Sequence, residues 1–178
     1  MRERTTGARR AFDNLESDHP GKGREMDLHE VLKFVHVAAA IVWVGGAVTL
    51  EIMGLRAGRR ADTAGMVAFG KDAEVIGRVY GAATALVLAM GIWMVVDSPA
   101  IEFSDAWISI ALGLTVIMFL MGPLFFEKHA KAISSLAESK GGDAPEVRST
   151  MGRMMLVARI DSAFAFFIVW LMVVKPGA

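Results

Sequence analysis

The side chain best suited to hold a cofactor is His36, which lies near the start of a long apolar run, 34–50. An ionisable residue inside a membrane span is a functional candidate. Met90 and Met94 lie four residues apart in the next apolar run, 79–96. If the two runs form helices of opposite direction, a rise of about 1.5 Å per residue brings Met94 to the depth of His36 and Met90 one turn deeper.

Imidazole nitrogen and thioether sulfur suit both haem iron and Cu(I). We therefore predict that His36, Met90 and Met94 bind a cofactor, haem b or copper, with His36 and Met94 as the metal ligands. Two alternatives stay open for His36. Its ring can make a structural hydrogen bond to a neighbouring helix or to water, or it can handle protons.

A second set of polar side chains is expected towards the other end of the helices. Near-neutral groups of charges lower the cost of placing each charge in a low-dielectric environment. This set predicts either a clamp that fixes helix register or a polar path for protons or an anionic ligand. Its members are Glu51, Arg78, Tyr80, Arg159 and Asp161.

Composition excludes several kinds of chemistry. The chain has no cysteine, which removes disulfides, thiolate metal sites and cysteine nucleophiles. The formal net charge is zero, so no basic excess indicates nucleic acid binding. Neither a phosphate-binding loop, an HExxH motif nor a Ser-His-Asp set occurs. We predict no catalytic residue, and we interpret the 12 methionines mainly as packing residues.

Four apolar runs place these residues in an all-α, four-helix transmembrane bundle of up-down-up-down order. A spanning helix needs about 20 residues, and the predicted spans are about 31–53, 77–97, 106–126 and 154–174. The fourth span reaches this length only if Arg159 and Asp161 enter it. Residues 26–178 form the transmembrane domain. We expect 1–25 to be a disordered tail or to lie upstream of the true start, Met26.

One face of the first span carries residues of small size. Spacings of three and four place His36, Ala39 or Ala40, Trp43, and Gly46 or Ala47 on one side, with Gly45 beside them. Small residues let membrane helices approach closely, so this is the predicted packing face. It supports a rival function, a non-catalytic accessory subunit that packs against a membrane partner or a second copy of the chain.

The connections predict the orientation. Segments 56–78 and 127–155 are rich in Lys and Arg, whereas 97–105 contains three acidic residues and no basic one. The positive-inside rule places the two basic segments in the cytoplasm and both termini outside, in a bacterial cytoplasmic membrane. Segment 127–155 is expected to contain a helix extension, a turn at Gly141-Gly142, and a new helix near Glu146.

The pattern H-x6-W-x-G-G, from His36 to Gly46, resembles that of uncharacterised bacterial four-helix integral membrane families. It is also distantly similar to the CopD copper-resistance and HemJ protoporphyrinogen oxidase families. Similarity to HemJ implies that His36 corresponds to a histidine linked to haem, and it adds a HemJ-like oxidase as a third functional hypothesis. Similarity to CopD rests on Gly77-Arg78 and Gly91, and implies copper.

Overall fold

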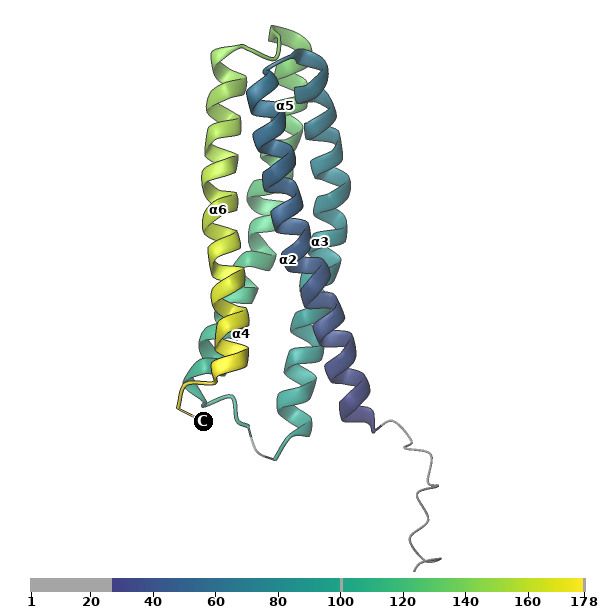
Figure 1. The fold of residues 1–178 in the computed structure, drawn as a ribbon, viewed down its shortest axis with the longest axis vertical. Helices are drawn as coiled ribbons and strands as arrows, with labels where there is room; N and C mark the ends of the chain where they lie inside the picture. The colour runs from purple at the N-terminus through teal and green to yellow at the C-terminus, as the bar shows by residue number, and fades with distance from the viewer. Residues whose placement is uncertain (1–26, 100, 178) are drawn as a thin grey trace, which may run out of the picture.

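The computed structural model describes residues 27–99 and 101–177, and their structure is helical apart from short connections. The expectation for 1–25 lies outside these residues. The helices are α2 (Leu28–Arg60), α3 (Thr63–Asp97), α4 (Ala106–Met121), the π-helix η1 (Gly122–Phe126), α5 (Glu127–Lys140) and α6 (Pro145–Val174). Helices α4, η1 and α5 form one continuous long helix, and successive long helices run in opposite directions, which confirms the predicted up-down-up-down bundle (Figure 1).

The two basic segments expected to be loops are mostly helical, and for 56–78 that expectation is wrong. Helix α2 continues to Arg60, and α3 begins at Thr63 after Ala61 and Asp62. Asp62 caps α3, because its carboxylate accepts a 2.7 Å hydrogen bond from the Gly65 N–H. In 127–155 the expected helix extension, turn and new helix are confirmed: α5 ends at Lys140 and α6 starts at Pro145.

The helices are therefore longer than a bilayer requires. The 33 residues of α2 extend about 50 Å, against a hydrocarbon core of about 30 Å. All four long helical stretches are apolar enough to cross a membrane. We call segments 56–78 and 127–155 together the polar tip, since they hold charged residues beyond the apolar part of the bundle.

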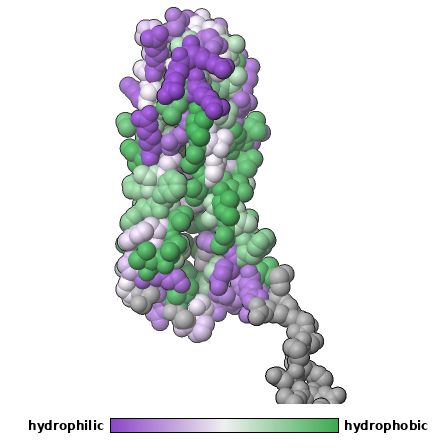
Figure 2. Space-filling model, viewed as in Figure 1, coloured by the Kyte–Doolittle hydropathy of each residue, from purple (hydrophilic) through white to green (hydrophobic). Residues whose placement is uncertain are grey.

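Exposed apolar side chains surround the bundle below the polar tip, among them Phe34, Ile41, Ile117 and Phe166. We call this surface the apolar band. Figure 2 shows it as hydrophobic residues over the middle of the molecule, with hydrophilic residues at the upper end and again near the lower end.

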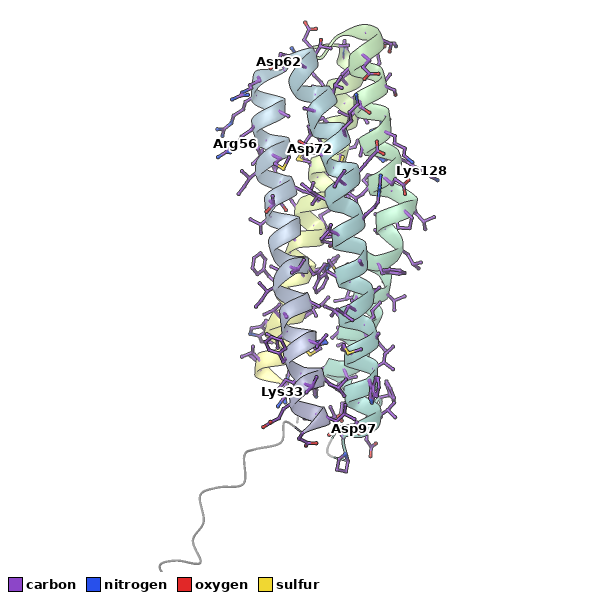
Figure 3. The ribbon with its side chains drawn as sticks, turned by 90° about the vertical axis from the view of Figure 1, so that its right-hand side faces the viewer. Lys33, Arg56, Asp62, Asp72, Asp97 and Lys128 are labelled. Carbon is purple, nitrogen blue, oxygen red and sulfur yellow. The ribbon has the colours of Figure 1, made fainter. Side chains whose placement is uncertain are left out.

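Charged residues mark both borders of the apolar band in Figure 3. Lys33 and Asp97 lie at one end of the bundle, and Arg56, Asp72 and Lys128 lie towards the other. This arrangement matches a bilayer across the band, with the polar tip in water.

Buried residues form two cores, one in the apolar band and one in the polar tip. The first lies inside the apolar band and includes Trp43, Tyr80 and Trp107. The second lies in the polar tip, where Met66, Phe69, Met151 and Met154 are packed with small side chains. These methionines are packing residues, in agreement with the interpretation of the composition.

The polar tip is closed by contact between its two turns. The Gly142 N–H donates a 2.9 Å hydrogen bond to Oγ1 of Thr63. A Cβ at Gly142 would lie 2.5 Å from the carbonyl carbon of Asp62, so only glycine permits this approach.

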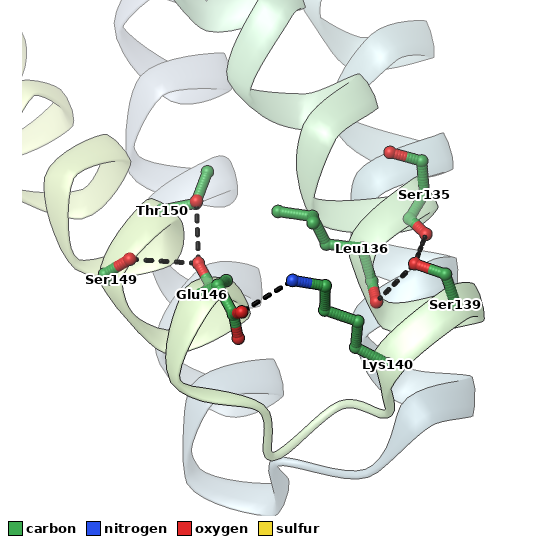
Figure 4. A network of polar contacts seen from close by, with 7 residues as sticks. All are labelled: Ser135, Leu136, Ser139, Lys140, Glu146, Ser149 and Thr150. Atoms are coloured by element: carbon green, nitrogen blue, oxygen red, sulfur yellow. Dashed lines mark hydrogen bonds and ion pairs between the residues drawn. The ribbon is translucent and has the colours of Figure 1, made fainter.

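Polar contacts within the second turn stabilise the start of α6 (Figure 4). Lys140 forms a 2.6 Å ion pair with Glu146, and the hydroxyls of Ser149 and Thr150 both donate to the Glu146 carbonyl. The α5–α6 connection is thereby held in one conformation at the end of the bundle.

The π-helix η1 interrupts the third long helix at the base of the polar tip. Pro123 has no N–H to donate and would break a regular α-helical ladder. The Glu127 N–H instead bonds the Gly122 carbonyl, five residues earlier. Single π turns of this kind are frequent at functional sites.

Candidate functional site

A cavity of about 310 Å³ lies where the apolar band meets the polar tip. It is partly open, and every long helix contributes to its wall. Tyr80 belongs to the core of the band and Met154 to the core of the tip, so the cavity occupies the junction between the two cores. Residues of η1, including Gly122 and Pro123, form part of the rim.

The inner wall holds a buried polar pair. The Tyr80 hydroxyl donates a 2.5 Å hydrogen bond to Oδ2 of Asp161, across helices α3 and α6. Both residues are buried, with 7% of Tyr80 and 8% of Asp161 exposed. Trp43 of α2 packs against the Tyr80 ring at a centroid distance of 6.4 Å, which holds the ring in place.

A second carboxyl group lies next to this pair. Glu51 of α2 accepts a short hydrogen bond from the hydroxyl of Ser162, the residue after Asp161. Glu51 is also close enough to Asp161 to interact with it electrostatically. Asp161 is part of the cavity wall, and Glu51 lies beside it without lining the cavity.

The predicted clamp of two arginines and two acids is wrong in its pairing. Asp161 and Glu51 are bonded by neutral hydroxyls, and Arg159 is exposed. Two residues along an α-helix are about 200° apart around its axis, so Arg159 and Asp161 face different directions. Arg78 is also exposed, although it contributes to the rim of the cavity.

Four charged side chains surround the mouth of the cavity: Glu74, Arg78, Glu127 and Lys131. Lys131 forms a 2.5 Å ion pair with Glu127, one helical turn before it. Arg78 interacts electrostatically with both, and Glu74 interacts with Lys131. The mouth thus carries two positive and two negative groups that balance each other.

The α3 wall of the cavity includes small residues at four-residue spacing: Ala73, Gly77 and Gly81. A Cβ added at Gly77 or Gly81 would meet nothing within 4 Å. These glycines therefore leave open space that larger side chains would fill.

His36 lies away from this cavity, on the part of α2 that packs against the outer half of α3. A Cβ at Gly91 would be 3.3 Å from the Cε1 atom of His36. The Nδ1 atom is buried and, among residues 27–99 and 101–177, has no hydrogen-bond partner. Met90 and Met94 lie one and three residues from Gly91 along α3, so the level of His36 is nearer to Met90 than to Met94, the methionine predicted to share its depth.

Metal binding by His36 stays a prediction. In the described part of the chain, no group of three or more His, Cys, Asp or Glu side chains is placed to hold a metal ion. Met90 and Met94 would contribute thioether sulfur in place of these side chains.

The predicted packing face of α2 is used inside the bundle. Ala39 and Trp43 are buried, Ala40 packs on the same core, and Gly46 lies against Tyr80, where a Cβ would be 3.5 Å from the ring. Gly45 is different: it is exposed and faces open space, so it is not part of this face.

Residues 30–176 match the family model DUF2269, described as a predicted integral membrane protein. The chain belongs to the DUF2269 family. The match includes nearly all of the four long helices and hence every residue of the cavity wall. No curated protein and no solved structure matches this DUF2269 chain.

In this DUF2269 protein the site combines an apolar wall with polar groups at two depths. Small ligand sites commonly have this composition, with few polar groups that fix orientation. The charged mouth suits a polar end group, the apolar wall suits a short hydrocarbon segment, and the Tyr80–Asp161 pair offers hydrogen bonds at the inner end.

Several residues of the site were missed from the sequence. Glu74 lies in segment 56–78, which was expected to be a loop, and Lys131 lies in the expected helix extension of 127–155 but was not named as a site residue. The spacing of Ala73, Gly77 and Gly81 was the one available signal, because small residues every four positions mark one side of a helix.

Proposed function

We propose that this DUF2269 protein binds a small amphiphilic molecule in the cavity between the apolar band and the polar tip. The observation that carries this proposal is a cavity of about 310 Å³ with a buried Tyr80–Asp161 pair in its wall and charged groups at its mouth. A packed bundle that served only as a scaffold would fill this junction with side chains.

The position of the cavity supports an amphiphile. The exposed apolar residues Leu124 and Leu156 show that the apolar band reaches this level, while Glu127 begins the polar tip. An amphiphile at the membrane interface has its polar group at the level of the cavity. Such a molecule enters the cavity from the surrounding lipid and does not have to cross the bilayer.

The proposal is tested with decanol that carries a photoactivatable diazirine in its chain, added to the protein in lipid nanodiscs. Labelled peptides are mapped by mass spectrometry. We expect labelling of the inner segments 73–81 and 154–161 in addition to lipid-facing side chains. Labelling confined to lipid-facing side chains contradicts the proposal.

Matched variants show whether the label enters the cavity. Gly77→Leu combined with Gly81→Leu fills the open space and removes the inner labelling, because a Cβ at either position meets nothing within 4 Å and the longer side chain extends into the cavity. The control is Gly45→Leu combined with Gly113→Leu. These two glycines are also unobstructed, but they are exposed in the apolar band and lie outside the cavity wall. The control retains the inner labelling.

A second candidate function is binding of haem b or copper through His36, and it is favoured by the buried Nδ1 atom without a partner. Its test is the visible spectrum of the purified protein together with elemental analysis for copper. A haem band or bound copper that disappears in His36→Ala, and persists in His29→Ala, supports it. A colourless, metal-free protein favours the accessory subunit over both this function and a HemJ-like oxidase.

We also propose that the polar tip lies in the cytoplasm of a bacterial cell, with both termini outside. The tip carries the basic residues Arg56, Arg59 and Arg60, whereas 97–105 at the opposite end has acidic residues and no basic one. This charge difference is the basis of the positive-inside rule.

A further inference from the structure

We infer that the ligand of the cavity is an amphiphilic cation whose positively charged group lies beside Asp161. This inference rests on the proposed function and names the ligand class. Its basis is the distribution of positive and negative groups around the whole cavity, and not only the presence of acidic residues.

The inner wall of the cavity holds the Asp161 carboxyl group, and the Glu51 carboxyl group lies beside it without lining the cavity; both have neutral partners. Tyr80 is the hydrogen-bond partner of Asp161, and Ser162 is that of Glu51. Within residues 27–99 and 101–177, no Lys, Arg or His nitrogen lies within 4.0 Å of either carboxyl group. Burying a carboxylate without a cation is costly, so this end of the cavity favours a positive group.

The charges of the other elements do not supply that positive group. At the mouth, Arg78 on α3 and Lys131 on α5 are balanced by Glu74 and Glu127. Arg159, on α6 itself, is exposed. The mouth is therefore neutral in sum, and the uncompensated charge is at the inner end.

Aromatic rings add a second contribution. Tyr80, Phe119 and Phe126 all line the cavity. A cation near the face of an aromatic ring is attracted by its quadrupole, and the attraction increases when water is excluded. An anion gains nothing from the same faces.

At low pH the Asp161 carboxyl group carries a proton, and in this neutral form it has no charge that attracts a cation. Binding of a cation then displaces that proton, which leaves through the mouth to water. One cation enters and one proton leaves, so the charge of the site does not change. Binding of a permanently charged cation is therefore tighter at higher pH.

The test uses three probes with the same diazirine-bearing ten-carbon chain and different end groups: trimethylammonium, hydroxyl and carboxylate. We expect the trimethylammonium probe to label 73–81 and 154–161 about tenfold more efficiently than the hydroxyl probe, and the carboxylate probe to label least. Raising the pH increases labelling by the trimethylammonium probe and leaves labelling by the hydroxyl probe unchanged.

Asp161→Asn removes the charge and keeps the shape of the side chain. In this variant the trimethylammonium and hydroxyl probes should label the inner segments equally. Glu127→Gln at the mouth is the control and retains the preference. Asp161→Glu, which restores the charge, retains it as well and shows that loss in Asp161→Asn is not loss of the fold.

The outcomes separate this inference from the proposed function. If the hydroxyl and carboxylate probes label the inner segments as well as the trimethylammonium probe does, the cavity binds amphiphiles and the cation inference is wrong. If no probe labels them, the proposed function fails too.

Discussion

The Tyr80 hydroxyl and the Asp161 carboxyl group form a 2.5 Å hydrogen bond that joins α3 to α6 at the inner wall of the cavity. Both residues are buried, and their surroundings at this level are the core of the apolar band. The pair has two consequences: it connects two helices that are distant in sequence, and it sets the chemistry that a ligand meets.

Removing the Tyr80 hydroxyl, which donates this hydrogen bond, tests how much the bond contributes to stability. Tyr80→Phe leaves the Asp161 carboxyl group without its partner, so we expect a loss of about 1–3 kcal/mol in the free energy of unfolding. Unfolding of the purified protein by heat and by denaturant in detergent measures it. The double variant with Asp161→Leu should lose less than the sum of the two single variants, because each single change already breaks the bond. Additive losses would show that the bond does not contribute.

Burial also predicts a difference between two acidic residues. Asp161→Leu lowers expression or thermal stability more than Glu127→Leu, because Asp161 is buried with a bonded tyrosine, whereas Glu127 is exposed and pairs with Lys131 at the surface. Exposed ion pairs contribute about 0–1 kcal/mol. Comparison of yield and melting temperature for both variants is the measurement. Equal, small effects would mean that the Asp161 bond has no structural role.

Close packing in the polar tip predicts a cost for a single methyl group. A Cβ at Gly70 would lie 2.7 Å from the Ala130 carbonyl oxygen and 2.8 Å from the Ser134 Cβ. Gly70→Ala therefore forces α3 and α5 apart, and we expect a loss of about 1–3 kcal/mol. The control is Gly58→Ala, where nothing lies within 4 Å. There, higher helix propensity should raise stability by up to about 1 kcal/mol.

Contact between the two turns predicts protection from proteases. Gly142→Ala places a Cβ 2.5 Å from Asp62, and Thr63→Val removes the acceptor of the Gly142 N–H. Both changes should increase the rate of tryptic cleavage at Arg60 and Lys140, which flank the turns. The rest of the bundle should stay intact, so tryptic cleavage at Lys33, at the opposite end of the bundle, should not increase. Unchanged cleavage at the turns would contradict a role for this contact.

The absence of native cysteine permits a clean test of topology. Single variants Asp62→Cys and Asp97→Cys lie at opposite ends of the bundle (Figure 3). A membrane-impermeant maleimide applied to intact bacterial spheroplasts should label Asp97→Cys, and should label Asp62→Cys only after lysis. Ile41→Cys, in the apolar band, should react only after denaturation. Labelling in the reverse order would place the polar tip outside.

Local sequence predicted the four helices because each apolar run is long enough to cross a bilayer. It did not reveal that segment 56–78 of the polar tip is helical. There, Met66, Phe69 and Ala73 recur at spacings of three and four, which is a helical period. Charged residues such as Lys71 and Asp72 between them gave the segment the composition of a loop.

The candidate site was also predicted only in part from the sequence. Glu51, Tyr80 and Asp161 were expected together on the basis of depth, and they do lie together. Their partners were not predictable, because depth along a helix says nothing about rotation around its axis. Rotation turns Arg159 outward and brings Ser162 to Glu51.

The sequence by itself determined that this is a membrane protein of four helices, since an apolar run of about 20 residues is stable as a helix in the hydrocarbon core of a bilayer. Only the tertiary structure decided that the helices leave a cavity at the junction of two cores. That cavity depends on a proline-containing π-helix in one helix and on glycines without side chains in another. Empty space between helices is a property of their mutual packing, which no single segment contains.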